Sequence, residues 1–199
     1  MVKTPRPRKA TAAPAPQVEC AAPAPRQHHQ AAAPRPGGIV SSSHLVSPKS
    51  LELSEFEFGL IVAWNAFSRW CVRCMAAAGC PDLTITDVLL MHHLCHRARH
   101  KKLADICFVL NYEDTHVVAY SLKKLVAGGL ATTEKQGKEV LYSPTPEGEA
   151  FVQQYRAVRE DCLVKSLDTE LNADIGELAR LLRTMSGMYD QAARAATSL

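Results

Sequence analysis

Apolar residues recur at helical spacing along three stretches of the 199-residue chain. The stretches cover residues 53–75, 151–162 and 175–192, and in each of them apolar side chains repeat three or four positions apart. Such spacing is typical of amphipathic helices that bury one face. We therefore predict long helices over residues 51–80 and within residues 147–199.

The pattern changes in the middle of the chain, over residues 84–146. Helical spacing is found at 87–96 and, after a short helical run and a turn, at 113–127; two β-prone runs follow at 130–134 and 139–143. Two short helices followed by a β-hairpin are the layout of a winged helix-turn-helix. The predicted fold is therefore mainly α with a small β-hairpin wing, flanked by the long helices.

The helix predicted over residues 113–127 has one face suited to DNA. At a period of 3.6 residues Val117 falls on the buried side, whereas His116 and Tyr120 fall on the outer side. Side chains near the start of such a helix reach base edges in the major groove, while lysines farther along or at the wing tip meet phosphates. The candidate DNA-binding residues are Thr115, His116, Ala119, Tyr120, Lys123, Lys124, Lys135 and Lys138.

From about Leu51 to its C-terminus the chain resembles the MarR family of transcription regulators. The resemblance is carried by the helix run 117–125, by Gly129-Leu130, and by residues 144–148, which stand where the family usually has Leu-Thr-x-x-Gly. It implies a symmetric dimer that binds a pseudo-palindromic operator and releases it on binding a small molecule or on oxidation. The wing departs from the family pattern, because the Asp-x-Arg element often found there is missing.

The apolar faces of the long helices need a partner. One small winged domain cannot cover three such faces, so helices from two copies are expected to pack across a two-fold axis. A monomeric helical bundle is the alternative. A dimer would also set two recognition helices about 34–36 Å apart, which suits successive turns of duplex DNA. We predict a homodimer on double-stranded DNA, with residues 51–80 and 147–199 as dimerisation helices and 84–146 as the winged helix-turn-helix.

Composition separates residues 1–50 from the rest of the chain. They hold nine of the twelve prolines, no aromatic residue and a net charge of +6, whereas the whole chain carries +3. We predict a disordered basic tail, because so little apolar surface cannot offset the entropy of ordering. Residues 97–138 carry +4, so positive charge also gathers on the predicted DNA-binding part. The tail fits a nucleic-acid-binding or a solubilising role equally well.

The sequence also indicates a compartment. No apolar run approaches the roughly 20 residues of a membrane span, and the N-terminal segment lacks the hydrophobic part of a secretory signal. Seven cysteines, an odd number on mostly helical segments, fit a reducing environment. We expect a cytoplasmic protein with no membrane partner and no cofactor.

Histidines and cysteines suggest two sensor hypotheses. His92 and His96 are four residues apart on a helix and could chelate zinc, although partly buried or surface histidines are the plainer interpretation. A CxxC motif also lies within a helical pattern, where its cysteines are first of all small apolar residues. A thiol sensor would need an exposed cysteine with a lowered pKa among the four candidates, which are Cys71, Cys74, Cys80 and Cys95.

A small apolar effector is a further expectation. In proteins that this chain resembles, an apolar cavity often lies between the dimerisation helices and the winged domain, and a ligand there could change the separation of the two DNA-binding parts. The residues expected at this cavity are Trp64, Phe67, Trp70, Cys71, His92, His93 and His96.

Enzymatic motifs are missing from the sequence, which has no phosphate-binding glycine loop and no nucleophile elbow. We therefore expect no enzymatic activity. From the winged helix pattern and the resemblance we predict a sequence-specific DNA-binding transcription regulator, which acts as a ligand-responsive repressor. Two alternatives keep the same fold: a protein-interaction module, in which the outer face of the 113–127 helix binds a partner protein, and a zinc or thiol redox sensor.

Overall fold

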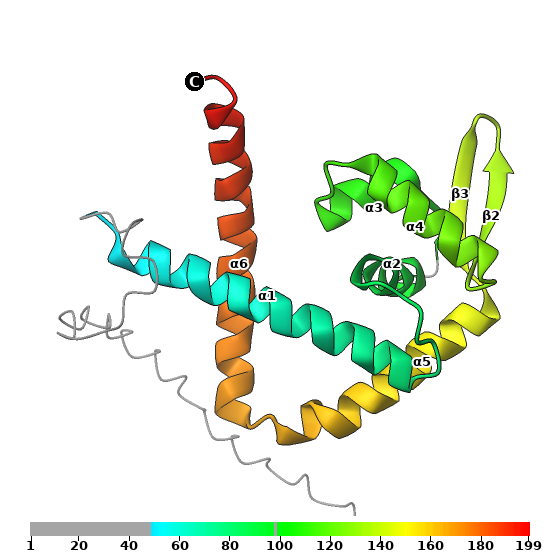
Figure 1. Cartoon of the computed structure of the whole chain (residues 1–199), viewed down its shortest axis with the longest axis horizontal. Helices are drawn as coiled ribbons and strands as arrows, with labels where there is room; N and C mark the ends of the chain where they lie inside the picture. The colour runs from blue at the N-terminus through cyan, green and yellow to red at the C-terminus, as the bar shows by residue number, and fades with distance from the viewer. Residues whose placement is uncertain (1–48, 98) are drawn as a thin grey trace, which may run out of the picture. The chain divides into compact units, whose positions relative to one another are not determined.

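The computed structural model describes residues 49–97 and 99–199. The tail predicted over residues 1–50 thus lies, except for its last two residues, outside the described part. The long helices are α1 (Leu51–Ala77), α5 (Pro146–Cys162) and α6 (Thr169–Ala196), with a short 3-10 turn, η2 (Val164–Ser166), between the last two. The helical prediction for both ends of the chain is confirmed (Figure 1).

Helix α2 (Ile85–Cys95) follows α1 after a short turn. Thr84 accepts a hydrogen bond from the backbone of Asp87 while the Asp87 side chain accepts one from the backbone of Thr84, which forms a capping box. At the other end the Lys101 ammonium donates to the carbonyls of Leu94 and His96 at 2.9 and 2.8 Å. These side chains supply partners to backbone groups that the helix itself leaves free.

The winged part consists of α3 (Leu103–Leu110), α4 (Thr115–Ala127), β2 (Ala131–Gln136) and β3 (Glu139–Pro144). Figure 1 shows α3 and α4 next to each other with the β2–β3 hairpin beyond α4. The predicted mainly α winged helix-turn-helix is therefore confirmed.

The wing belongs to a sheet of three strands rather than to a lone hairpin. Strand β1 (Lys101–Lys102) pairs antiparallel with β3, so the order is β1-β3-β2. The elements predicted from the sequence include no strand at residues 101–102. A strand of two residues is too short to show alternation of apolar and polar positions, so periodicity could not reveal it.

The core lies where α2 packs against α1, α4 and α5. Its fully buried side chains come from α1, α2, α3 and α4, and α5 adds the buried Tyr155. They include Met75, Val88, Leu90, Met91, Leu94, Ile106, Val118, Leu122 and Leu125. This core holds the winged part in a fixed geometry.

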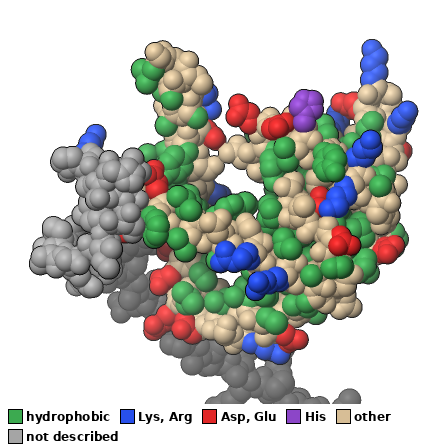
Figure 2. Space-filling view, viewed as in Figure 1, with side chains coloured by type: hydrophobic (Ala, Val, Ile, Leu, Met, Phe, Trp, Pro, Cys, Tyr) green, Lys and Arg blue, Asp and Glu red, His purple; other side chains and the backbone are tan. Residues whose placement is uncertain are grey.

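The first half of α1 and all of α6 remain poorly covered within one chain. On α1, Ile61 is 60% exposed and Trp64 48%, and on α6 Met188 is 57% exposed. Helix α6 contributes no buried residue, although its Tyr189 hydroxyl donates to the Glu57 carboxylate at 3.0 Å. Hydrophobic side chains are accordingly visible on the surface in Figure 2. Over the described residues, no helix combines the length and apolar character needed to cross a membrane.

Candidate functional site

Helix α4 is fixed at both ends by its sequence. The Asp114 carboxylate caps the start by accepting from the His116 backbone amide at 2.8 Å. At the far end Gly129 adopts φ +74°, a left-handed conformation that glycine takes without a steric penalty. The predicted helix over 113–127 is thus confirmed, with its start two residues later.

The inner and outer faces of α4 follow the predicted periodicity at most positions. Ser121 is buried together with the apolar residues Val118, Leu122 and Leu125. The outer face carries exposed Thr115, His116, Tyr120 and Lys123, with Ala119 half-buried at its edge.

Val117 departs from the prediction. The sequence analysis assigned it to the buried side, but its side chain is 44% exposed and lies beside Tyr120, which is 75% exposed. Val117 lies three residues before Tyr120 and seven before Lys124, at the boundary between the two faces of the helix, where its position in the sequence does not by itself decide burial.

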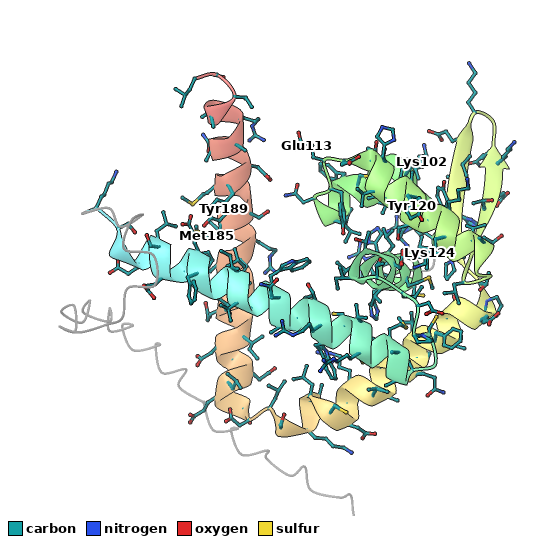
Figure 3. The ribbon with its side chains drawn as sticks, viewed as in Figure 1. Lys102, Glu113, Tyr120, Lys124, Met185 and Tyr189 are labelled. Atoms are coloured by element: carbon teal, nitrogen blue, oxygen red, sulfur yellow. The ribbon has the colours of Figure 1, made fainter. Side chains whose placement is uncertain are left out.

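Lys124 is engaged with α2. Its ammonium lies 2.8 Å from Oδ2 of Asp87 and donates to the Asp82 carbonyl at 2.7 Å. The Ser121 hydroxyl donates to the other carboxylate oxygen of Asp87. Figure 3 shows Lys124 on the α2 side of α4. Sequence reasoning missed this network, because its two charged partners are 37 positions apart.

Asp87 is a buried ionised group with its hydrogen bonds satisfied. Burial by itself raises the pKa of its carboxyl, but the hydrogen bonds from Lys124, Ser121 and Thr84 outweigh it and hold the pKa below the usual value. The carboxylate is therefore charged at neutral pH and ties the first turn of α2 to α4.

The wing tip carries the other predicted lysines. Gly137 turns the hairpin with φ +63°, and Lys135 and Lys138 on either side of it are exposed. In Figure 2 a basic side chain marks the tip at the upper right. Close to the hairpin turn, Lys102 and Glu139 form an ion pair at 2.6 Å, which joins β1 to β3.

The turn between α3 and α4 is tied to α6. Asn111 adopts a left-handed conformation with φ 55°, and its amide donates to the Asp190 carboxylate at 3.3 Å. Before this turn, on α3, Phe108 is 87% exposed and Val109 62%. The sequence analysis singled out none of these four residues.

The residues predicted for an effector pocket are divided among several places. Trp64 and Phe67 form a tilted ring pair at 6.2 Å and are about half exposed. Cys71 and His92 instead lie in the core around Tyr155, with the His92 ring edge-on to the tyrosine at 4.3 Å.

The remaining effector residues differ as well. Trp70 packs partly buried against the core, whereas His93 and His96 line a separate cavity of about 370 Å³ beside the basic loop at Arg97 and Arg99. The described cavities therefore do not bring the seven predicted residues together.

His92 has an unusual environment. Its Nε2 atom is buried without a hydrogen-bond partner among the described residues, as is the Ser68 hydroxyl. Burial lowers the pKa of His92, and the nearby Arg159 lowers it further. The ring is accordingly neutral at pH 7.

Metal and thiol chemistry receive little support from the geometry. In the described part of the chain no three His, Cys, Asp or Glu side chains gather closely enough to hold a metal ion. Burial raises the pKa of Cys71, Cys74, Cys80 and Cys95, so none of the four has the lowered pKa that a thiol sensor requires.

Comparison with known proteins identifies the middle of the chain. Residues 83–148, which contain both α4 and the wing, match the family of winged helix DNA-binding domains. No curated protein sequence matches the chain.

Solved structures extend the likeness to the long helices. AbfR of Staphylococcus epidermidis is 18% identical, with a TM-score of 0.57 over 68% of this chain and 92% of that one. A mutant MarR from E. coli, solved with operator DNA, is 16% identical, with a TM-score of 0.53 over 66% and 95%. A MarR family regulator from Rhodococcus sp. RHA1 is 14% identical, with a TM-score of 0.53 over 65% and 94%. The chain thus has the fold of MarR regulators.

Proposed function

We propose that this chain, a MarR-like regulator with a winged helix DNA-binding domain, is a repressor that binds a pseudo-palindromic operator as a homodimer and responds to a ligand. The matched family is one of DNA-binding domains rather than of enzymes. The proposal also includes a cytoplasmic location for the protein.

One observation carries the proposal: α4 exposes a continuous face beside a wing with two exposed lysines. His116, Tyr120 and Lys123 lie on that face, and Lys135 and Lys138 lie at the wing tip. An α-helix fits the major groove, and a wing beside it can follow the phosphate backbone. The MarR structure with operator DNA shares this fold, which makes DNA the first ligand to test.

The decisive measurement is affinity for duplex DNA as a function of salt. Each phosphate neutralised by a lysine steepens the fall of affinity with salt, by a slope of about 0.9 on logarithmic axes. The Lys138→Ala variant should weaken binding to all sequences and reduce that slope by about one. His116→Ala should instead change the preference at one base pair of each half-site. Equal affinity for selected and scrambled duplexes would refute sequence-specific binding.

The dimer is supported by the uncovered apolar faces of the long helices. Exposed large apolar side chains on α1 and α6 make a surface that water-exposed helices rarely carry. They are Leu53, Phe58, Leu60, Ile61, Val62, Trp64 and Phe67 on α1, and Leu171, Ile175, Leu178, Leu181 and Met188 on α6. Sedimentation equilibrium should give twice the chain mass, and Ile61→Asp with Met188→Asp should shift it toward one chain. A native chain that remains single at micromolar concentration would rule the dimer out.

The ligand response is supported by the unsatisfied Nε2 atom of His92 in the core between α1, α2 and α5. A small molecule with a polar group and an apolar body could bind that atom while packing on the same helices. Titration of apolar carboxylic acids and phenols into an operator complex tests this. His92→Phe should abolish any release that wild type shows, whereas a response unchanged in that variant would place the ligand elsewhere.

A second candidate function, binding of a partner protein, is favoured by the exposed Phe108 and Val109 on α3. Salt separates the two functions, because an apolar protein interface responds weakly to salt whereas DNA binding weakens steeply.

A further inference from the structure

We propose that the recognition helix α4 reads its operator mainly through the 5-methyl groups of thymine, which contact Val117 and Tyr120. This inference rests on the proposed DNA-binding function and specifies which base feature the site recognises. The side chains that α4 presents to a base pair determine what it can recognise.

The first half of α4 lacks the side chains that read bases by paired hydrogen bonds. Residues 115–120 read Thr-His-Val-Val-Ala-Tyr and contain no Arg, Lys, Asn or Gln. Arg and Lys make bidentate contacts to guanine, and Asn and Gln make them to adenine, so neither purine can be read in that way from this half. His116 and Thr115 offer only single hydrogen bonds.

The nearest residues that could fill the gap are already engaged. The Lys124 ammonium is held by Asp87 and by the Asp82 carbonyl at 2.8 and 2.7 Å. The Asn111 amide, in the turn before α4, donates to Asp190. Lys123 is free of such contacts in the described part of the chain, but it lies in the second half of the helix, where phosphate contact is expected.

The same face presents apolar surface instead. Val117 is 44% exposed and Tyr120 75%, and both line a hollow of about 260 Å³ at the edge of α4 that faces α2. Figure 3 shows Tyr120 on α4 above Lys124.

Thymine is the base that such a surface can recognise. In the major groove it is the base that carries a C5-methyl group, which makes apolar contacts with protein side chains. Burying one methyl group contributes about 0.8 kcal/mol, which corresponds to roughly a fourfold change in affinity. One or two such contacts in each half-site would give a preference for T at defined positions.

Replacing thymidine by deoxyuridine tests the inference, because that change removes the methyl group and keeps every base-pairing hydrogen bond. Duplexes are first selected from a random pool with the full chain. Each thymidine of a selected half-site is then replaced in turn, and the dissociation constants are compared. We expect at least one position where the replacement weakens binding about fourfold.

Two alanine variants and one conservative variant assign the effect to the residues. With Val117→Ala, the loss of affinity on replacing the contacted thymidine by deoxyuridine should fall below twofold. Tyr120→Ala should reduce the loss in the same way at a neighbouring thymidine, whereas Tyr120→Phe should leave the loss unchanged. Lys138→Ala is the matched control, since it should weaken thymine and uracil duplexes equally. Circular dichroism checks that each variant folds, which the exposure of both side chains favours.

Three outcomes would overturn the inference. Uracil duplexes that bind within twofold of the parent at every position would exclude methyl contacts, and a penalty that persists in both alanine variants would exclude Val117 and Tyr120 as the residues that make them. If selection enriches no sequence and affinity shows no salt dependence, the proposed DNA-binding function fails, and the thymine inference fails with it. Tight, salt-dependent binding without a methyl effect would leave the function standing and refute only the inference.

Discussion

The ion pair between Asp87 and Lys124 should couple the stability of α2 to that of the recognition helix. The Asp87 side chain is 2% exposed and that of Lys124 is 36% exposed, with their charged atoms 2.8 Å apart. The perturbation is a double-mutant cycle of Asp87→Asn and Lys124→Met, measured by urea unfolding of the full chain. Protomer concentration is held fixed, because the stability of a dimer depends on it.

The structure sets the size of the expected effects. Breaking a fully buried ion pair costs about 3–5 kcal/mol, and an exposed pair contributes about 0–1 kcal/mol. Since solvent reaches Lys124 but barely reaches Asp87, we expect a coupling energy of about 2 kcal/mol. Each single substitution should destabilise the fold by about 2–3 kcal/mol, because Ser121 and the Thr84 amide still bind position 87.

The pH dependence of the coupling has a definite sign. Because the folded state lowers the pKa of Asp87 from 3.8, the pair stabilises the protein above that pH and loses its effect as pH falls through the lower folded value. The exposed pair of Lys165 and Asp161, four residues apart on one surface, serves as the control and should show no measurable coupling.

A coupling energy below about 0.5 kcal/mol at pH 7 would refute the reasoning, since it would equal that of an ordinary surface pair. The DNA readout provides a second check. Because Lys124 is already paired, Lys124→Met should leave the salt slope of DNA binding nearly unchanged, whereas Lys123→Met should reduce it by about 0.9.

Three further predictions concern packing, protonation and thiol reactivity. Gly148→Ala should destabilise the fold by about 1–3 kcal/mol, because a Cβ there would overlap the Leu130 carbonyl oxygen and lie 2.7 Å from Met91 Cε. Gly176→Ala is the control: a Cβ there would have nothing within 4 Å, so the substitution should stabilise the fold by about 0.5–1 kcal/mol. Equal urea midpoints for the two variants would contradict this prediction. Burial holds the pKa of His92 below 6.5, so as the pH falls below 6.5 the unfolded chain takes up a proton more readily than the folded chain does. The free energy of unfolding should therefore decrease, and it should decrease less in His92→Phe. Identical pH profiles for the two proteins would refute this prediction. In a thiol titration at pH 8, Cys162→Ser should remove one fast-reacting thiol, because Cys162 is exposed. Cys71→Ser should remove none, because Cys71 is buried and burial raises the pKa of its thiol. Loss of a fast phase in Cys71→Ser would show that the core opens.

Periodicity was sufficient to predict the elements that matter for binding. The helix over 113–127, the wing with Gly137 at its turn and the long terminal helices all follow from local patterns, since each element is long enough to repeat its period several times. Strand β1 has two residues and leaves no such pattern.

Long-range pairings were beyond local patterns. Asp87 looked like an ordinary first-turn acid of a helix, and nothing near it in the sequence indicates Lys124. Val117 lies at the boundary between the two faces of α4, where a rotation of the helix by a few tens of degrees decides burial, and that rotation is set by the α2–α4 contact. The candidate site could thus be located from the sequence, but two of its side chains differ from the prediction. Lys124 is engaged with α2 instead of being free to contact phosphate, and Val117 is exposed instead of buried.

The wing and the start of α5 are joined by close backbone contacts. Thr145 binds the carbonyls of Leu130 and Gly129 at 3.0 and 2.6 Å, and Gly148 packs without spare room on the same Leu130 carbonyl. The wing base and the first turn of α5 therefore form one rigid unit, and α5 is about 25 Å long at 1.5 Å per residue. A tilt of α5 by some ten degrees about its C-terminal end would displace the wing base by roughly 4 Å, so a small rearrangement among the terminal helices would be enough to move the hairpin.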